Sequence, residues 1–160
     1  MCYAGFVRVM AVDYGDRRIG LALSDVTGLL ARPWKTIEHA GDLPAAATRV
    51  AADVHELATE EDGLGRVVVG LPRRLGGEPN TQTARVETFC DLLRQRVDVD
   101  VVLQDERLSS HAADELLARR ERDWRRRKAQ LDAMAAAVIL QDFLDGQPAR
   151  RAPDQPPEDL

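Results

Sequence analysis

Three acidic residues in separate parts of the chain have residue types suited to chemistry at phosphorus. Asp13 ends an apolar run, Glu106 follows another beside Asp105, and Asp132 lies early in the last predicted helix. Carboxylates directed into one site repel each other and lose solvation unless a cation neutralises them. Mg²⁺ prefers oxygen ligands, and two such ions about 4 Å apart can activate water against a phosphodiester. The acids therefore predict a catalytic site that holds Mg²⁺ or Mn²⁺.

Each acid also has a purely structural interpretation. Asp13 could cap a turn, and Asp132 could be an acid favoured by the dipole at a helix N-terminus. Glu106 or Asp105 could pair with Arg107 in an ordinary salt bridge. Strand alternation directs one of Asp105 and Glu106 inward and the other outward, without telling which. The sequence shows no Ser-His-Asp order, nucleophile elbow or supported Cys-His pair as a competing catalytic arrangement.

Basic residues cluster near the acids and could hold a polyanion over them, even on a chain with a formal net charge of −5. We expect these residues to bind nucleic acid: Arg17, Arg18, Arg73, Arg74, Arg107, Arg126 and Lys128. Trp124, inside the basic run Arg119–Lys128, could stack on a base. The alternative is a solvated linker with Trp124 packed on the core.

Composition indicates a single globular domain. The chain has 160 residues, of which 44% are hydrophobic and 31% charged. Its two cysteines, Cys2 and Cys90, form no CxxC, and its three histidines are scattered, so neither a zinc site nor a disulfide framework is predicted. No segment approaches the roughly 20 apolar residues of a membrane span, and no signal peptide is recognisable. We expect a cytoplasmic protein.

The elements that must position the acids follow from hydrophobic periodicity and breaker residues. Short apolar runs predict strands at Val7–Val12, Ile19–Leu23, Ala31–Ile37, Arg66–Gly70 and Val99–Leu103. Helices are predicted at Ala45–Glu60, from Asn80 or Thr81 to about Arg96, from Ser109 or Ser110 through Leu117, and at Ala129–Asp145. Pro33 favours an edge position or the start of its strand.

This order predicts an α/β fold. Three adjacent strands imply antiparallel hairpins, and the later alternation of strands and helices implies parallel neighbours. The result is a mixed five-stranded sheet with helices on both faces. We assign residues 1–146 to this domain and residues 147–160 to a Pro-rich, disordered tail.

The last predicted helix places Asp132 on its core-facing side. Its neighbours at helical spacing are Ala136, Ile139 and Phe143, which form an apolar stripe. The helix is also rich in alanine, so it can approach a strand closely.

Four motifs in this order resemble those of the YqgF (RuvX) family, known as Holliday junction resolvases with an RNase H-like fold. They are VDYGDRRIGLALSD, VVVGLPRRLGG, DERLSS and KAQLDAMAAAVILQDFLD, and the resemblance spans roughly Arg8 to Asp145. It implies a nuclease acting on structured nucleic acid, with Asp13, Glu106 and Asp132 as catalytic residues and metal ligands. Such nucleases often have a fourth acid, for which Asp105 is the nearest candidate.

The family further implies maturation of the 5′ end of the pre-16S rRNA. Cleavage of branched DNA as a Holliday junction resolvase is an alternative, and it would need two active sites, so a monomer and a homodimer remain open. A non-catalytic module that binds nucleic acid or a ribosome precursor would retain the basic loops without needing the acids. A sugar-kinase-like or actin-like ATPase would need a second phosphate loop, which the chain lacks.

Overall fold

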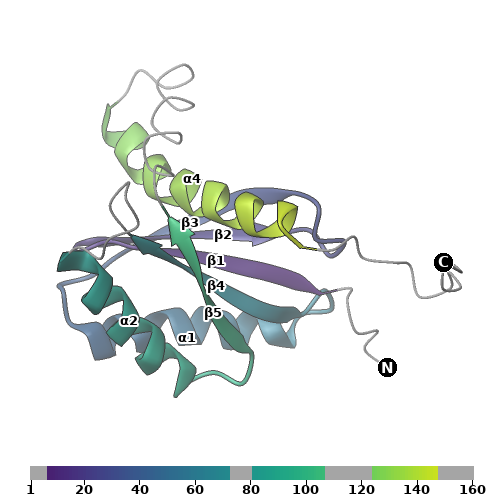
Figure 1. Ribbon diagram of the computed structural model, residues 1–160, viewed down its shortest axis with the longest axis horizontal. Helices are drawn as coiled ribbons and strands as arrows, with labels where there is room; N and C mark the ends of the chain where they lie inside the picture. Colours follow the sequence, from purple (N-terminus) through teal and green to yellow (C-terminus); the bar gives the residue numbers. More distant parts are fainter. Residues whose placement is uncertain (1–6, 73–80, 107–123, 148–160) are drawn as a thin grey trace, which may run out of the picture.

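The chain forms one mixed sheet with helices packed on both of its faces (Figure 1). The computed structural model describes residues 7–72, 81–106 and 124–147. The strands are β1 (Arg8–Tyr14), β2 (Arg18–Ser24), β3 (Ala31–Glu38), β4 (Leu64–Pro72) and β5 (Asp100–Glu106). The helices are α1 (Leu43–Thr59), α2 (Thr81–Arg94) and α4 (Trp124–Asp145).

The sheet has the order β3-β2-β1-β4-β5. β1, β2 and β3 pair antiparallel, whereas β1, β4 and β5 are parallel neighbours. The carboxyl ends of the parallel strands β1, β4 and β5 therefore lie at the same end of the sheet, where α/β proteins bind their ligands. This arrangement confirms the predicted RNase H-like, mixed five-stranded fold, and β3, which contains Pro33, is an edge strand as predicted.

Alternate residues of β1 enter two separate cores. Met10 and Val12 pack with α1 and α2, whereas Val9 and Ala11 pack with α4. In Figure 1, α1 and α2 lie on one side of the sheet and α4 on the other. Because both faces are covered, the strand is apolar at nearly every position rather than at every second one.

The first helix, α1, begins at Leu43 rather than at the predicted Ala45. Asp42 is its N-cap, and the Asp42 carboxylate accepts a hydrogen bond of 3.1 Å from the Ala45 N–H. Pro44 occupies the first turn, where its missing N–H costs nothing.

Several boundaries differ from the sequence-based predictions. α4 begins at Trp124 rather than at Ala129, and β5 continues to Glu106 rather than ending at Leu103. The charged run before α4 has no apolar periodicity, so its helical part is not visible from hydrophobic pattern. The helix predicted from Ser109 or Ser110 and the tail at 147–160 lie outside the described residues, apart from Gln147. Within the described ranges, no helix is long and apolar enough to cross a membrane.

Candidate active site

The β1–β2 hairpin places Asp13 next to Gly20. The turn between the strands is closed by the Gly15 N–H, which donates to the Arg18 carbonyl at 2.9 Å. In the ladder that follows, Asp13 and Gly20 are paired residues on adjacent strands. Asp13 is partly buried and ends the central, parallel part of the sheet.

Gly20 allows α4 to approach the hairpin. A Cβ atom on Gly20 would lie 1.9 Å from the Asp132 carbonyl oxygen and 2.8 Å from the Ala133 nitrogen. Both neighbours are backbone atoms, so no rotamer change could relieve the clash, and any side chain here would displace the helix. The absence of a side chain at Gly20 therefore places Asp132 close to Asp13.

The two carboxyl groups interact electrostatically. Burial, and to a smaller extent the negative charge of Asp132, raise the pKa of Asp13 from 3.8 to about 7. Ala136, Ile139 and Phe143 are buried in the core under α4, so Asp132 lies on the apolar side of the helix as predicted. This paired, partly buried arrangement is unusual for acids that only cap a turn or a helix.

Arg18 supplies the cation nearest to Asp132 among the described ion pairs. Its Nε atom lies 2.9 Å from the Asp132 Oδ2 atom, and the two side chains are 32% and 26% exposed. Arg18 thus neutralises the charge of Asp132. The pKa of Asp13 is raised because burial and Asp132 both disfavour its charged form.

The register of β5 distinguishes Glu106 from Asp105. Val102 packs in the core under α4, whereas Val101 and Leu103 pack in the core of α1 and α2. By strand alternation, position 106 shares the face of Val102, and Asp105 shares the face of Leu103. Asp13 follows Ala11 on the α4 face, so the alternation favours position 106 over position 105 as its neighbour. The Glu106 side chain lies outside the described residues.

The described residues include carboxylate oxygens of a kind suited to a cation. Asp13 and Asp132 offer hard oxygen donors whose mutual repulsion a divalent ion would relieve, so their chemistry fits Mg²⁺ or Mn²⁺. No group of three or more His, Cys, Asp or Glu side chains suited to a metal occurs in residues 7–72, 81–105 and 131–147. A third carboxylate for such an ion would have to come from the remaining residues, among which Glu106 stays the predicted ligand.

Two of the predicted basic residues lie beside this acid pair. Arg17 and Arg18 line a pocket next to the hairpin, together with His39 and Arg85. Neither His39 nor Arg85 is predicted from the sequence, because a scattered histidine and one arginine within a helix carry no motif.

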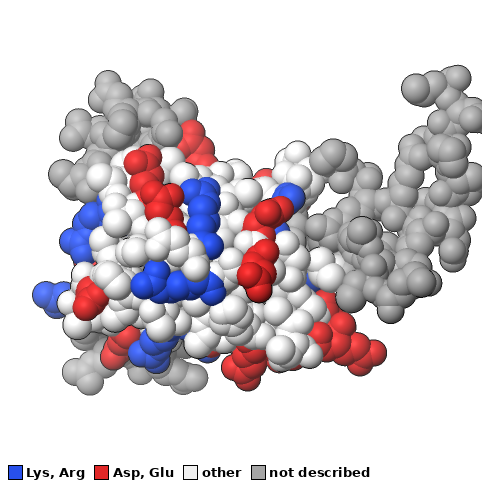
Figure 2. Space-filling view, turned by 90° about the horizontal axis from the view of Figure 1, so that it is seen from below, with Lys and Arg blue, Asp and Glu red and all other residues white. Residues whose placement is uncertain are grey.

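The other basic residues cannot be placed around the site. Arg73, Arg74 and Arg107 lie outside the described residues, and Arg126 and Lys128 lie in α4 with side chains that are also outside them. On the face formed by α1 and α2, Figure 2 shows acidic and basic side chains interspersed rather than a uniformly basic surface.

Comparison with known proteins places these residues in a family context. The sequence model of a family described as "RuvX: Holliday junction resolvase" matches residues 7–146. The chain is 39% identical over 140 residues to a "Putative pre-16S rRNA nuclease" of Roseiflexus sp. (strain RS-1), covering 88% of this chain and 95% of that protein. It is 40% identical over 146 residues to a protein of the same name from Chloroflexus aggregans (strain MD-66 / DSM 9485), covering 91% and 96%.

The chain is also similar to solved structures. The chain resembles "T. thermophilus RuvC in complex with Holliday junction substrate" with a TM-score of 0.47 and 16% sequence identity, covering 83% of this chain and 91% of that chain.

Proposed function

The chain belongs to the RuvX family, and on that premise we propose that it is a divalent-metal-dependent nuclease that hydrolyses phosphodiester bonds in structured nucleic acid. One observation carries the proposal: two carboxyl groups from β1 and α4 lie together, and the pKa of Asp13 is raised to about 7. Clustered acids with perturbed pKa values are typical of catalytic and metal-binding sites.

Asp13, Asp132 and Glu106 would hold the ion, which we take to be Mg²⁺ or Mn²⁺. When bound, such an ion supplies a Lewis acid that stabilises negative charge developing on the phosphodiester. We include Glu106 because its position in β5 shares a sheet face with Val102 by strand alternation, and Asp13 belongs to the same face.

The chain's own residues prepare this site. The missing side chain at Gly20 lets the backbone of Asp132 pack closely against β2, so the spacing of the two acids depends on helix packing. Arg18 lies 2.9 Å from Asp132 and orients that carboxylate. Burial of Asp13 removes water that would otherwise screen its charge, which strengthens its attraction for a cation.

Maturation of pre-16S rRNA is the substrate assignment we favour. Both relatives described above are named for it, and they match this chain over nearly their whole length. Cleavage of a four-way DNA junction is the second candidate, favoured by the description of the family. These substrates share a phosphodiester backbone, so the acid pair serves either reaction.

Cleavage assays test the proposal. A precursor rRNA fragment and a four-way DNA junction are incubated with Mg²⁺ and the native chain, Asp13→Asn or Asp100→Asn. Asp100 is a matched control because its side chain is 78% exposed and lies at the start of β5, at the opposite end of that strand from Glu106. We expect cleavage by the native chain and Asp100→Asn, and a loss of at least about 100-fold for Asp13→Asn. Binding without cleavage by the native chain would instead support a non-catalytic module.

A further inference from the structure

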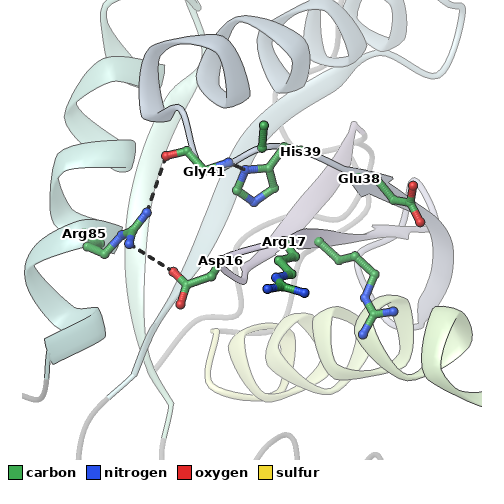
Figure 3. A pocket seen from close by; sticks show the side chains of 8 residues that line it. Asp16, Arg17, Glu38, His39, Gly41 and Arg85 are labelled. Carbon is green, nitrogen blue, oxygen red and sulfur yellow. Dashed lines mark hydrogen bonds and ion pairs between the residues drawn. The ribbon is translucent and has the colours of Figure 1, made fainter.

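A polar pocket of about 650 Å³ is connected to the acid pair through Arg18, which lines the pocket and lies 2.9 Å from Asp132. Three separate segments form it: the β1–β2 turn, the end of β3 with the loop before α1, and α2 (Figure 3). Its lining residues are Asp16, Arg17, Arg18, Glu38, His39, Ala40, Gly41 and Arg85.

His39 fixes the shape of this pocket. The Gly41 N–H donates to Nδ1 of His39 at 3.1 Å, so Nε2 carries the proton and donates to the Gly15 carbonyl at 2.6 Å. The backbone N–H of His39 also donates to the Arg17 carbonyl at 2.9 Å. These bonds tie the β1–β2 turn to the loop before α1, so the backbone that carries Arg17 is held in place.

The three arginines differ in how firmly they are engaged. Arg18 contacts Asp132, as described above. Arg85 Nη1 lies 3.4 Å from Asp16 Oδ1, and Arg85 Nη2 donates a long hydrogen bond of 3.5 Å to the Gly41 carbonyl. Because the Arg85 and Asp16 side chains are 42% and 58% exposed, this ion pair holds Arg85 only weakly. The guanidinium of Arg17 has no ion pair or hydrogen bond with any residue that the structure describes.

The arginines of the pocket suit an anion. Arg17 and Arg85 bring two guanidinium groups to its wall, whereas Arg18 is paired with Asp132, and the carboxylates of Asp16 and Glu38 also line the pocket. Guanidinium groups bind phosphate oxygens in a forked geometry, and an open polar pocket suits a phosphate that stays part of a chain. Arg17 and Arg18 are consecutive and both line this pocket, and Arg18 also contacts Asp132 of the acid pair.

We propose that this pocket binds a backbone phosphate of the substrate strand next to the phosphodiester held at the acid pair, through Arg17 and Arg85. The inference rests on the proposed nuclease function and adds the place where the flanking strand lies. Arg85 exchanges its weak contact with Asp16 for the phosphate, and Arg17 provides the second guanidinium. His39 is a positioning residue that supports the turn and does not touch the ligand.

Strand binding without divalent cations tests this pocket separately from cleavage. The affinity for a fluorescent single-stranded oligonucleotide is measured in EDTA between 50 and 300 mM KCl for five proteins. They are the native chain, Arg17→Ala, Arg85→Gln, the double variant and Arg32→Ala. Arg32 is a matched control because it is exposed on β3 and pairs with Leu23, at the opposite end of β2 from Arg18. Thermal unfolding confirms that each variant is folded.

We expect the double variant to bind at least about 10-fold more weakly, with a salt dependence reduced by about one to two ions. Arg32→Ala should stay within twofold of the native chain. A double variant with native affinity and native salt dependence would overturn the pocket assignment, even if the native chain cleaves nucleic acid. Conversely, weakened binding by the double variant supports the pocket even if the native chain proves unable to cleave.

Inorganic phosphate distinguishes a strand site from a site for the free anion. Titrated as a competitor against the oligonucleotide, it should bind the native chain at least about 100-fold more weakly than the strand, because only the strand also contacts residues outside the pocket. Equal affinities for inorganic phosphate and the strand would contradict a backbone subsite.

Discussion

Gly20 lies directly against the backbone of Asp132, with room for a hydrogen atom and for no side chain. A Cβ at this position would come within 1.9 Å of the Asp132 carbonyl oxygen, and Gly20 is also the ladder partner of Asp13. The same glycine therefore joins the strand that carries one acid to the helix that carries the other. The packing of α4 on β2 is thus part of the construction of the site.

Substitution of this glycine should damage both stability and activity. Gly20→Ala must push α4 away from β2, which we expect to destabilise the fold by about 1–3 kcal/mol and to reduce cleavage by the folded protein. Gly146→Ala is the control, because its Cβ would meet its nearest neighbours at 3.5 Å, an ordinary contact. Urea unfolding measures both effects, and equal stability of the two variants would show that the close approach is not needed.

The pKa of Asp13 predicts a pH-dependent stability. The folded chain keeps a proton on Asp13 up to about pH 7, whereas the unfolded chain loses it near 3.8. The folded state therefore binds more protons within this window, and its stability falls as the pH rises from about 4 to 7. Asp13→Asn removes that loss, so without divalent cations it should exceed the native chain in stability at pH 8 by up to about 4 kcal/mol.

The same comparison at pH 3 serves as the internal control, because Asp13 is then largely protonated in both states and the advantage of Asn should largely disappear. Chemical unfolding at both pH values measures the difference. An Asp13→Asn variant that is less stable than the native chain at pH 8 would contradict the raised pKa of Asp13.

Arg18 should matter through Asp132. Arg18→Met removes the cation that lies 2.9 Å from the Asp132 carboxylate, and we expect kcat/KM for cleavage to fall about 10-fold. Arg18→Lys should recover part of this loss, since it restores the charge without the guanidinium geometry. The control is Arg66→Met, because Arg66 forms only a long, exposed pair of 3.9 Å with Asp100. Equal rates for Arg18→Met and Arg66→Met would remove Arg18 from the site.

The ion pair of Lys35 and Asp53 should affect stability alone. Lys35 Nζ lies 2.5 Å from Asp53 Oδ1, and the Asp53 side chain is only 11% exposed. Lys35→Met leaves this carboxylate without its cation, so we expect a loss of about 1–3 kcal/mol in the free energy of unfolding. The double variant Lys35→Met/Asp53→Leu should recover most of it. A change in cleavage per folded molecule would mean that this pair influences the site.

The sequence predicted the elements whose signals are local. The spacing of Ala136, Ile139 and Phe143 correctly placed Asp132 on the buried side of α4, because helical periodicity is read within one segment. The apolar periodicity of Ala45–Glu60 correctly predicted α1, which spans Leu43–Thr59, since this signal is also local. The position of Pro33 on an edge strand followed from its missing N–H.

Features that depend on register or on contacts between distant segments needed the structure. Sequence alone left Asp105 and Glu106 equivalent, and only the core packing of their strand neighbours assigns the two positions to different faces. Arg85 enters the pocket from α2 across from the β1–β2 turn, a juxtaposition that no spacing in the sequence reveals. The clash at Gly20 is likewise visible only once α4 is packed against β2.

The most direct test of the central claim is the location of a bound Mn²⁺ ion. Crystals of the native chain and of Asp13→Asn are soaked in Mn²⁺, and anomalous difference density is compared. We predict a peak in contact with the carboxylates of Asp13 and Asp132 in the native crystals and its loss in Asp13→Asn. A native crystal in which Mn²⁺ binds elsewhere, with no density at these two carboxylates, would contradict a shared cation site.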